Sequence, residues 1–343
     1  MKRPAKKRKT AKKEKRLEKR KTSKKGKLSY VKKSARKGRK SRKKRGGTNS
    51  EHFTKLRKWV PIDKLDWKRL SGNPNAIPIL EKNLDKVDWY WLSQNPNAIP
   101  ILEKNLDKVV WIYLSGNPNA ITILEKNPEK VNWSYLSSNQ KAIPILEKNL
   151  YKVGWTQLSS NPKAIPILEK KLDKVNWYWL SGNPNAITIL ENNLGKVDWA
   201  GLSENPNAIH ILGKNLDKVN WSMLSQNPNA IHMLENNLDK VDWRVLSSNP
   251  KAIHMLEKNL DKVDWALLSG NPNAIHILEK NLYKVNWTEL SQNPNIFEYD
   301  YLAIKNRMYK KDGIAEDLMK NRFHPKNMSR WTKWGHDSVF DDE

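Results

Sequence analysis

Cysteine is absent from this chain of 343 residues, phenylalanine occurs only 4 times, and no long apolar run is present. Without cysteine, neither a disulfide nor a thiolate zinc site can form, which is typical of chains that fold in a reducing compartment. No stretch approaches the roughly 18 apolar residues of a membrane helix, and no apolar segment follows the basic N-terminal residues as it would in a secretory signal. These absences predict a soluble, intracellular protein that does not enter a membrane.

Acidic residues are almost missing from residues 1–50, which hold 26 Lys and Arg against Glu14 and Glu18. We call this segment the basic tail. The other residues carry 38 basic and 34 acidic side chains, so most of the net charge of +28 lies in the tail. Its few apolar residues predict disorder, because too little surface can be buried to offset the entropy of ordering.

Nucleic acid is the expected partner of the basic tail, because Lys and Arg neutralise phosphates and release condensed counterions. With little aromatic content for stacking on bases, the tail is expected to bind without base readout. The candidate nucleic-acid-binding residues are Lys6, Lys7, Arg8, Lys9, Lys12, Lys13, Arg36, Lys37, Arg39, Lys40, Arg42, Lys43, Lys44 and Arg45. Two alternatives stay open: residues 4–9 have the pattern of a basic nuclear-import signal, and the tail could serve solubility alone.

Tryptophan, by contrast, recurs every 22 residues without insertion or deletion. The repeated residues are Trp67, Trp89, Trp111, Trp133, Trp155, Trp177, Trp199, Trp221, Trp243, Trp265 and Trp287. A fixed period of roughly 20 to 50 residues predicts a solenoid, in which each unit buries its apolar face against its neighbours. We expect the solenoid over residues 51–295, followed over residues 296–343 by a helical C-terminal cap with an acidic end.

Each repeat is expected to form two short helices at sharp turns. Asn97 is expected to cap a helix over residues 98–104, with Pro100 tolerated in its first turn. Asn105 is expected to end that helix in a left-handed conformation. The Asp or Asn that precedes most of the tryptophans predicts the cap of a second helix, such as residues 89–93.

A leucine-rich repeat is the competing architecture, because Leu84, Val87 and Trp89 match the start of its LxxLxL strand pattern. Leu92 occupies the position where that pattern has asparagine, and the Asn-Pro turn has no place in it. The favoured fold is therefore an all-α solenoid of about 10–11 two-helix units. We expect an open rod on the order of 100 Å long.

The repeated text, NPKAIHMLEKNLDKVDW from Asn249 onward, is followed by IFEYDYLAIKNRM and FHPKNMSRW in the closing segment. It resembles the 22-residue Asn-Pro/Trp repeat proteins of giant DNA viruses of the mimivirus type, over about residues 60–335. It is more distantly similar to the leucine-rich variant repeat, an α-solenoid. The resemblance implies a viral setting and no catalysis, and it does not cover the basic tail.

The two residues after each repeat tryptophan differ most between units, and we call them the variable pair. Shared positions of a solenoid build its core, whereas unshared positions often face a partner, and exposed Trp and Tyr are common anchors of interfaces. The alternative is that they pack between adjacent units. The candidate partner-binding residues are Tyr90, Trp91, Ile112, Tyr113, Tyr135, Tyr178 and Trp179.

Three further columns of residues recur at the repeat period. His210, His232, His254 and His276 suggest a metal site, but stacked helices lie roughly 8–10 Å apart, too far for two ligands that must each lie about 2 Å from one zinc ion. The eleven serines of the Leu-Ser pair, Ser71 to Ser291, are expected to cap backbone groups. The Glu and Lys columns, such as Glu103 and Lys108, are expected to form a solvated face.

These patterns predict no catalytic residue, metal, cofactor or small-molecule substrate. The function expected is that of a non-enzymatic scaffold or adaptor, in which the basic tail binds nucleic acid and the solenoid binds an unidentified protein. The alternative is a host-directed interaction module whose tail serves only as a nuclear-import signal. The viral resemblance implies a location in the virion, the viral factory or the host nucleus.

Overall fold

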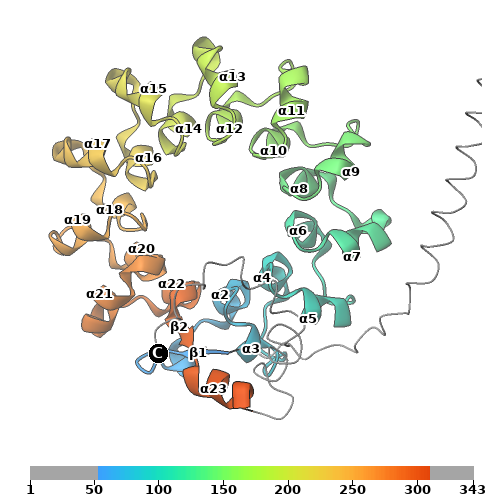
Figure 1. The fold of residues 1–343 in the computed structure, drawn as a ribbon, viewed down its shortest axis with the longest axis vertical. Helices are drawn as coiled ribbons and strands as arrows, with labels where there is room; N and C mark the ends of the chain where they lie inside the picture. The colour runs from blue at the N-terminus through green and yellow to red at the C-terminus, as the bar shows by residue number, and fades with distance from the viewer. Residues whose placement is uncertain (1–52, 310–343) are drawn as a thin grey trace, which may run out of the picture. The chain divides into compact units, whose positions relative to one another are not determined.

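The structure, a computed structural model, describes residues 53–309 and contains two layers of short helices (Figure 1). Eleven inner helices each begin at a repeat tryptophan. They are α2 (Trp67–Gly72), α4 (Trp89–Gln94), α6 (Trp111–Gly116), α8 (Trp133–Ser138), α10 (Trp155–Ser159), α12 (Trp177–Ser181), α14 (Trp199–Glu204), α16 (Trp221–Gln226), α18 (Trp243–Leu246), α20 (Trp265–Gly270) and α22 (Trp287–Ser291).

The outer layer follows the Asn-Pro turns. It consists of α3 (Ile77–Leu80), α5 (Ile99–Lys104), α7 (Ile121–Lys126), α9 (Ile143–Glu147), α11 (Ile165–Leu168), α13 (Ile187–Glu191), α15 (Ile209–Gly213), α17 (Ile231–Glu235), α19 (Ile253–Glu257) and α21 (Ile275–Lys280). The all-α solenoid predicted from the sequence is confirmed, and the leucine-rich alternative is excluded because a helix begins at each repeat tryptophan.

Single 3-10 turns connect many of these helices. They are η1 (Ile62–Lys64), η2 (Pro128–Lys130), η3 (Glu169–Lys171), η4 (Leu194–Lys196), η5 (Leu216–Lys218), η6 (Leu238–Lys240), η7 (Pro272–Ala274), η8 (Leu282–Lys284) and η9 (Pro294–Ile296). Within residues 53–309 every helix is too short or too polar to cross a membrane.

The inner helices begin as the sequence predicts. In nine of them the side chain of the preceding Asp or Asn accepts a hydrogen bond from the third helical N–H, as Asp88 does from Trp91 at 3.1 Å. Val110 and Gly154 stand at the other two caps and provide no such bond. Pro100 lies in the first turn of its outer helix, where a missing N–H leaves no bond unmade.

Two expectations about asparagines in the outer helices are wrong. Ala98, not Asn97, is the N-cap of α5 and makes no side-chain capping bond. The side chain that organises this turn belongs to Asn95, whose Oδ1 accepts the N–H of Asn97 at 3.0 Å. Asn105 has φ −135° and ψ 48°, which is not left-handed, and its Nδ2 donates to the carbonyl of Ile101 at 2.8 Å.

The apolar core lies between the two layers and continues from repeat to repeat. Leu92 of the inner helix, and Ala98 and Leu102 of the outer segment, are fully buried, as are their equivalents in most repeats. The inner helices have only 4–6 residues and the outer helices 4–6, too short to be stable alone. Their stability therefore depends on stacking against the neighbouring repeats.

A ladder of buried polar side chains joins successive repeats. The hydroxyl of Ser93 donates to the carbonyl of Trp89 at 2.7 Å. It also accepts a hydrogen bond at 3.0 Å from the N–H of Val110, which immediately precedes the next inner helix. Asn117 donates its amide to the carbonyls of Ser93 and Asn95, both at 3.0 Å. Equivalent Ser and Asn residues are buried at every junction of the described repeats. The eleven serines are structural, as the sequence analysis expected.

The same ladder joins the last repeat to the first and closes the solenoid into a ring (Figure 1). Asp66 donates its N–H to the hydroxyl of Ser291 at 2.8 Å, across 225 residues. Asn73 donates its amide to the carbonyls of Ser291 and Asn293, both at 3.0 Å. In a ring of eleven 22-residue repeats, two residues that lie 225 apart in the sequence are 17 apart when counted across the seam. The Ser–Asx pairs of the other junctions have the same separation of 17 residues. The first repeat occupies the place of a twelfth, so the expectation of an open rod is wrong.

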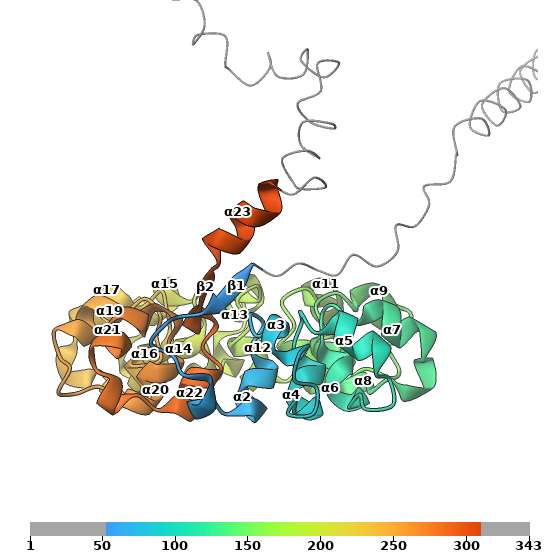
Figure 2. The ribbon, with the colours of Figure 1, turned by 90° about the horizontal axis from the view of Figure 1, so that it is seen from below.

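One closing unit of the ring is composed of both ends of the repeat region. Strand β1 (Thr54–Leu56) pairs antiparallel with β2 (Phe297–Tyr299), in the register Leu56 with Phe297, and this ribbon stands where other units have an outer helix (Figure 2). Asp300 donates its N–H to the carbonyl of Phe53 at 2.7 Å. The Arg57 guanidinium donates to the carbonyl of Asn295 at 2.8 Å.

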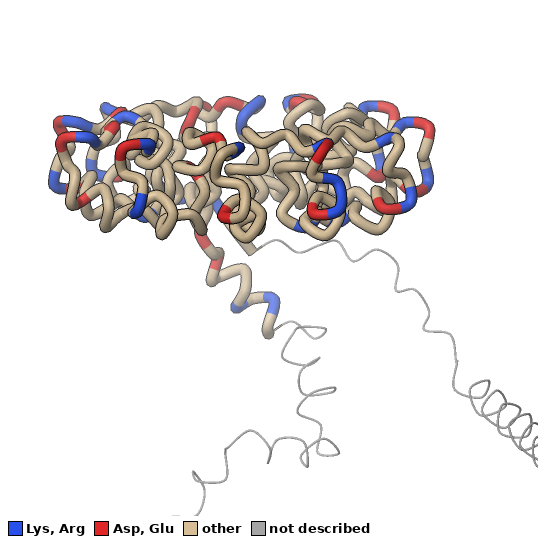
Figure 3. The backbone as a smooth tube through the Cα atoms, turned by 90° about the horizontal axis from the view of Figure 1, so that it is seen from above, with Lys and Arg blue, Asp and Glu red and all other residues tan. Residues whose placement is uncertain are grey.

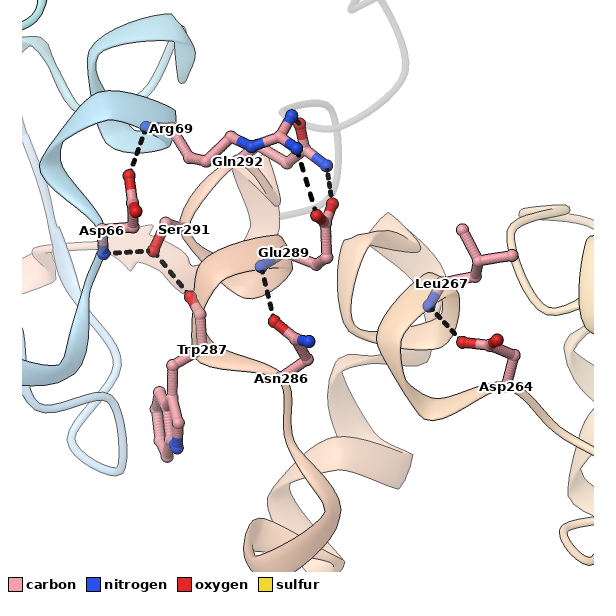
Figure 4. A network of polar contacts seen from close by, with 9 residues as sticks. All are labelled: Asp66, Arg69, Asp264, Leu267, Asn286, Trp287, Glu289, Ser291 and Gln292. Carbon is pink, nitrogen blue, oxygen red and sulfur yellow. Dashed lines mark hydrogen bonds and ion pairs between the residues drawn. The ribbon is translucent and has the colours of Figure 1, made fainter.

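The inner layer is also joined at this seam, which Figure 4 shows from close by. The guanidinium of Arg69 lies 3.2 Å from the carboxylate of Glu289 and 3.3 Å from the side-chain oxygen of Gln292. On the other side of the unit, Trp59 contacts Trp287 with 6.5 Å between ring centroids. Contacts in both layers therefore hold the ring closed.

The segment after the repeats differs from the expected cap. The segment expected to be a helical cap begins with strand β2, and one helix, α23 (Tyr301–Tyr309), follows within the described residues. The last repeat is covered by the first repeat, which leaves no solenoid end for a cap to cover. The remainder of the predicted cap, including Trp331 and Trp334, lies outside the described residues.

Candidate functional site

The variable pairs lie on the inner helices, and apart from Arg69 and Glu289, which join the seam, their side chains differ widely between repeats. In three repeats the pair has no aromatic or charged residue and contains Ala or Ser, Ala200–Gly201, Ser222–Met223 and Ala266–Leu267, and in four repeats it contains Tyr or Trp. The inner helix and its buried leucine are the same in both cases. The framework therefore does not require the aromatic side chains.

Three neighbouring repeats bring Tyr90, Trp91, Tyr113 and Tyr135 together in one cluster. The rings of Tyr90 and Tyr113 are 3.9 Å apart between centroids, and those of Tyr113 and Tyr135 are 5.4 Å apart with edge-to-face geometry. A hydrogen bond with Tyr90 is the main reason why the pKa of Tyr113 is raised to about 12. The cluster is thus an uncharged surface of rings and hydroxyls at neutral pH.

Part of this cluster packs between units, the alternative that the sequence left open. Trp91 lies over Gly72 of the preceding repeat, where an added Cβ would meet the indole at 3.3 Å. The guanidinium of Arg69 lies 5.2 Å from the Trp91 ring centroid. Tyr135 lies similarly over Gly116. Trp91 is consequently half-buried, whereas Tyr90, Ile112 and Tyr135 are exposed.

The most exposed aromatic pair lies two repeats further on, in α12. Tyr178 is 50% exposed and Trp179 is 48% exposed, and their rings meet at right angles with 5.3 Å between centroids. The next repeat places Gly201 beside them, and a Cβ at this glycine would lie 2.8 Å from the carbonyl of Tyr178. Because the two inner helices approach so closely, residue 201 has no side chain with which to cover the pair.

Three positions of these inner helices carry no charge in five successive repeats. Counted from the repeat tryptophan as the first, the second, third and sixth residues of the five repeats that contain α4 to α12 are all exposed or half-buried and uncharged, and we call these fifteen residues the aromatic arc. They are Tyr90, Trp91, Gln94, Ile112, Tyr113, Gly116, Ser134, Tyr135, Ser138, Thr156, Gln157, Ser160, Tyr178, Trp179 and Gly182. All seven candidate partner-binding residues belong to it.

Charged residues instead recur with both signs around the outside of the ring (Figure 3). His210, His254 and His276 each lie 2.7 Å from a glutamate of the preceding repeat. His232 lacks that glutamate because Gly213 stands in its place, and it contacts Asn236 at 3.4 Å. Among the described residues, no three His, Cys, Asp or Glu side chains gather as a metal would require.

The lysine column packs against tryptophan, although the sequence predicted only a solvated face. Lys86 lies 5.0 Å from the ring centroid of Trp67 in the preceding repeat, and the corresponding lysine stands over a tryptophan at every junction. Lys64 lies over Trp287 at the seam. Such cation–π contacts contribute about 0.5–1 kcal/mol each at exposed sites. The constant spacing of Lys and Trp was the signal available in the sequence.

The candidate nucleic-acid-binding residues of the basic tail, Lys6 to Arg45, lie outside the described residues. Comparison with protein-family models, with curated proteins and with solved structures gives no match to this chain.

Proposed function

We propose that this protein is a non-enzymatic scaffold that binds nucleic acid through its basic tail and a protein partner through the aromatic arc. The observation that supports the proposal most is that the excess positive charge and the exposed aromatic residues lie in different parts of the chain. Residues 1–50 hold 26 basic and 2 acidic side chains, whereas the aromatic arc holds no charged side chain. The two parts therefore suit partners of different chemistry.

The tail suits a polyanion. Each Lys or Arg that neutralises a phosphate releases counterions, so affinity is independent of base sequence and falls steeply with salt concentration. The candidate contacts are the fourteen Lys and Arg residues named above. The ring contributes less to this attraction because its residues 53–309 hold 31 basic and 26 acidic side chains.

A scaffold is favoured over an enzyme because the recurrent polar residues already have structural partners. The hydroxyl of Ser203, for example, donates to Trp199 at 2.7 Å and accepts from Asn220 at 3.0 Å. A nucleophile needs a base and an orienting group beside it. Eleven equivalent serines with the same two backbone partners fit a framework better than a catalytic centre.

The resemblance to giant-virus repeat proteins supports a viral setting, with the protein acting in the virion, the viral factory or the host nucleus. A second function follows from the basic run at residues 4–9. In this alternative the ring is a host-directed interaction module and the tail only directs nuclear import. Nuclear accumulation of a reporter fused to residues 1–50, without affinity of the whole chain for nucleic acid, supports the alternative.

The test is binding of duplex DNA and of RNA by the whole chain, by a chain lacking residues 1–50, and by a chain in which the fourteen candidate residues are changed to Gln. The whole chain is expected to bind with an affinity that falls by orders of magnitude between about 50 and 200 mM salt. The chain lacking residues 1–50 is expected to lose binding, and the chain with fourteen substitutions, which keeps the other 12 basic residues of the tail, is expected to bind much more weakly and with a shallower salt dependence. Equal affinity of all three would remove the tail from the proposal.

A further inference from the structure

We infer that the aromatic arc binds an extended, uncharged, proline-rich segment of a protein. The inference rests on the proposed function, because it specifies the partner of the same surface. Its starting point is that Tyr178 and Trp179 are about half exposed although the ring does not need them. Ala266–Leu267 occupy the same positions in α20, where the buried Leu268 and Ser269 are preserved.

Charge excludes polyionic ligands from the arc. No Lys or Arg lies at its positions to neutralise a phosphate backbone, and no Asp or Glu lies there to attract a polycation such as residues 1–50. The cations that flank the arc already have partners: Arg69 is paired with Glu289 and stacked on Trp91, and a lysine stands over the repeat tryptophan of each inner helix of the arc. The ligand must therefore be neutral where it touches the arc.

The spread of the rings defines the shape of the ligand. Exposed aromatic residues run from Tyr90 in α4 to Trp179 in α12, with the polar Thr156 and Gln157 between the two groups. Only an elongated ligand can contact both groups at once. The arc is built from helices, so it offers no strand edge with which an extended peptide could pair.

A polyproline II segment meets these requirements. It is extended, has no internal hydrogen bonds and needs no strand edge, and its rigidity lowers the entropy lost on binding. Proline-rich segments dock on surfaces lined by Tyr and Trp rings. Here the perpendicular rings of Tyr178 and Trp179 provide two faces for apolar pyrrolidine rings, and the Tyr hydroxyls and Gln157 provide hydrogen-bonding groups for the exposed carbonyls of the peptide.

The test uses the full chain and a short fluorescent peptide of neutral Pro-Pro-Leu repeats, followed by fluorescence polarisation. The expected result is saturable binding that changes little with salt and survives deletion of residues 1–50. Replacing the pair with that of α20, Tyr178→Ala with Trp179→Leu, is expected to weaken binding about tenfold or more. Met223→Ala, at a variable position outside the arc, is the matched control and is expected to bind as the parent chain does.

Three outcomes would overturn the inference. If a neutral peptide with Ser in place of Pro binds equally well and is equally sensitive to the double substitution, the arc binds protein but does not select proline. If a neutral glucan shows saturable binding that the double substitution weakens, and the peptides do not bind, the ligand is a carbohydrate and the protein-binding part of the proposed function also fails. If the double variant keeps the parent's urea unfolding midpoint and its full affinity for the peptide, the arc is not the site.

Discussion

At the scale of the residue, two side chains hold consecutive repeats together: the serine after each buried leucine and the asparagine before each proline. Both are fully buried and have their hydrogen bonds satisfied by backbone groups of the same and the adjacent repeats. The sequence predicted a structural role for the serine and a turn for the Asn-Pro pair. It did not predict the ladder, because the asparagine's partners lie 22 and 24 residues away and no local pattern identifies them.

Asn205 is the residue on which we expect the ladder to be most easily tested. Its amide donates to the carbonyls of Ser181 and Asn183, both at 2.9 Å, and its Oδ1 accepts the N–H of Asn207 at 3.0 Å. Asn205→Ala leaves these buried groups without partners, so the free energy of unfolding is expected to fall by about 3 kcal/mol. Urea denaturation measures the change.

The control is Asn207→Lys. Asn207 is exposed, and lysine already occupies its position at Lys141, Lys163 and Lys251. We expect this variant to unfold within about 0.5 kcal/mol of the parent chain. A loss as large in the control as in Asn205→Ala would contradict the importance of the buried ladder.

A second residue-scale prediction concerns Asp242. Burial acts to raise the pKa of this carboxyl, but the hydrogen bonds donated by the Ser222 hydroxyl and the Val245 N–H outweigh it, so its pKa lies below the ordinary value. Because the folded pKa is the lower one, the carboxylate contributes stability above the unfolded pKa, and this contribution is lost as pH falls through the folded pKa. Ser222→Ala is expected to raise the folded pKa.

Ser222→Ala is therefore expected to be less stable than the parent chain at neutral pH, by less than about 1 kcal/mol for this partly exposed group, and this difference is expected to disappear as pH falls below the folded pKa of the parent carboxyl. NMR titration of the carboxyl and urea unfolding across acidic pH measure both effects. Ser134→Ala is the matched control, because the cap that follows it is Gly154, which has no carboxyl. Identical pH profiles for Ser222→Ala and Ser134→Ala would refute the assignment.

At the scale of the element, helix starts were the most predictable feature because their causes are local. The Asx cap before the tryptophan and the proline in the first turn each act within one turn of helix, and the structure contains both. The predictions of a cap at Asn97 and of a left-handed Asn105 were wrong because other hydrogen bonds form instead. The side chain of Asn95 accepts the N–H of Asn97, and the side chain of Asn105 donates to the carbonyl of Ile101. Strand β2 was missed because its partner β1 lies more than 200 residues away.

Val110 provides a test of the capping account. It precedes α6 with φ −90° and ψ 93°, close to the backbone angles of Asp88 before α4, but it makes no side-chain cap. The N–H of Tyr113 donates to the Val110 carbonyl at 3.0 Å, and Val110→Asp is expected to replace this bond with one to the carboxylate and to stabilise the protein by up to about 1 kcal/mol. Thermal and urea unfolding measure this gain.

Val110→Ala removes the valine without adding a cap and is the control for the lost apolar contact. The account expects Val110→Asp and Val110→Asn to be more stable than Val110→Ala. If the three variants have the same unfolding midpoint, the side-chain cap does not limit the stability of α6.

At the scale of the whole molecule, the shared residues predicted the solenoid but not its closure. The small rotation from one repeat to the next accumulates over the whole array, and no residue pattern reports that angle. The two ends of the array did contain a sign. Ile62-Asp63-Lys64-Leu65-Asp66 matches the second half of a repeat, and Asn293-Pro294-Asn295 the beginning of one. The two incomplete halves together make one repeat, which the ring assembles from both ends.

The aromatic arc was found only in part by sequence reasoning. The variability and aromatic character of Tyr178 and Trp179 identified them as candidates, and the structure leaves both about half exposed. The packing of Trp91 over Gly72 was not foreseeable, because it depends on the register between adjacent inner helices. The neutrality of the arc was visible in the sequence, but only the ring places its residues on one continuous layer.

Ring closure is the central claim, and a cysteine pair across the seam tests it most directly because the chain has no cysteine of its own. Thr54 and Tyr299 are register partners in β1 and β2, and such partners have Cα atoms about 4.5–5.5 Å apart, within the range that a disulfide spans. After oxidation, Thr54→Cys with Tyr299→Cys is expected to give a monomer with increased mobility on a non-reducing denaturing gel, reversed by reductant. A monomer of unchanged mobility, or disulfide-linked dimers alone, would show that the two ends lie apart and that the solenoid is open.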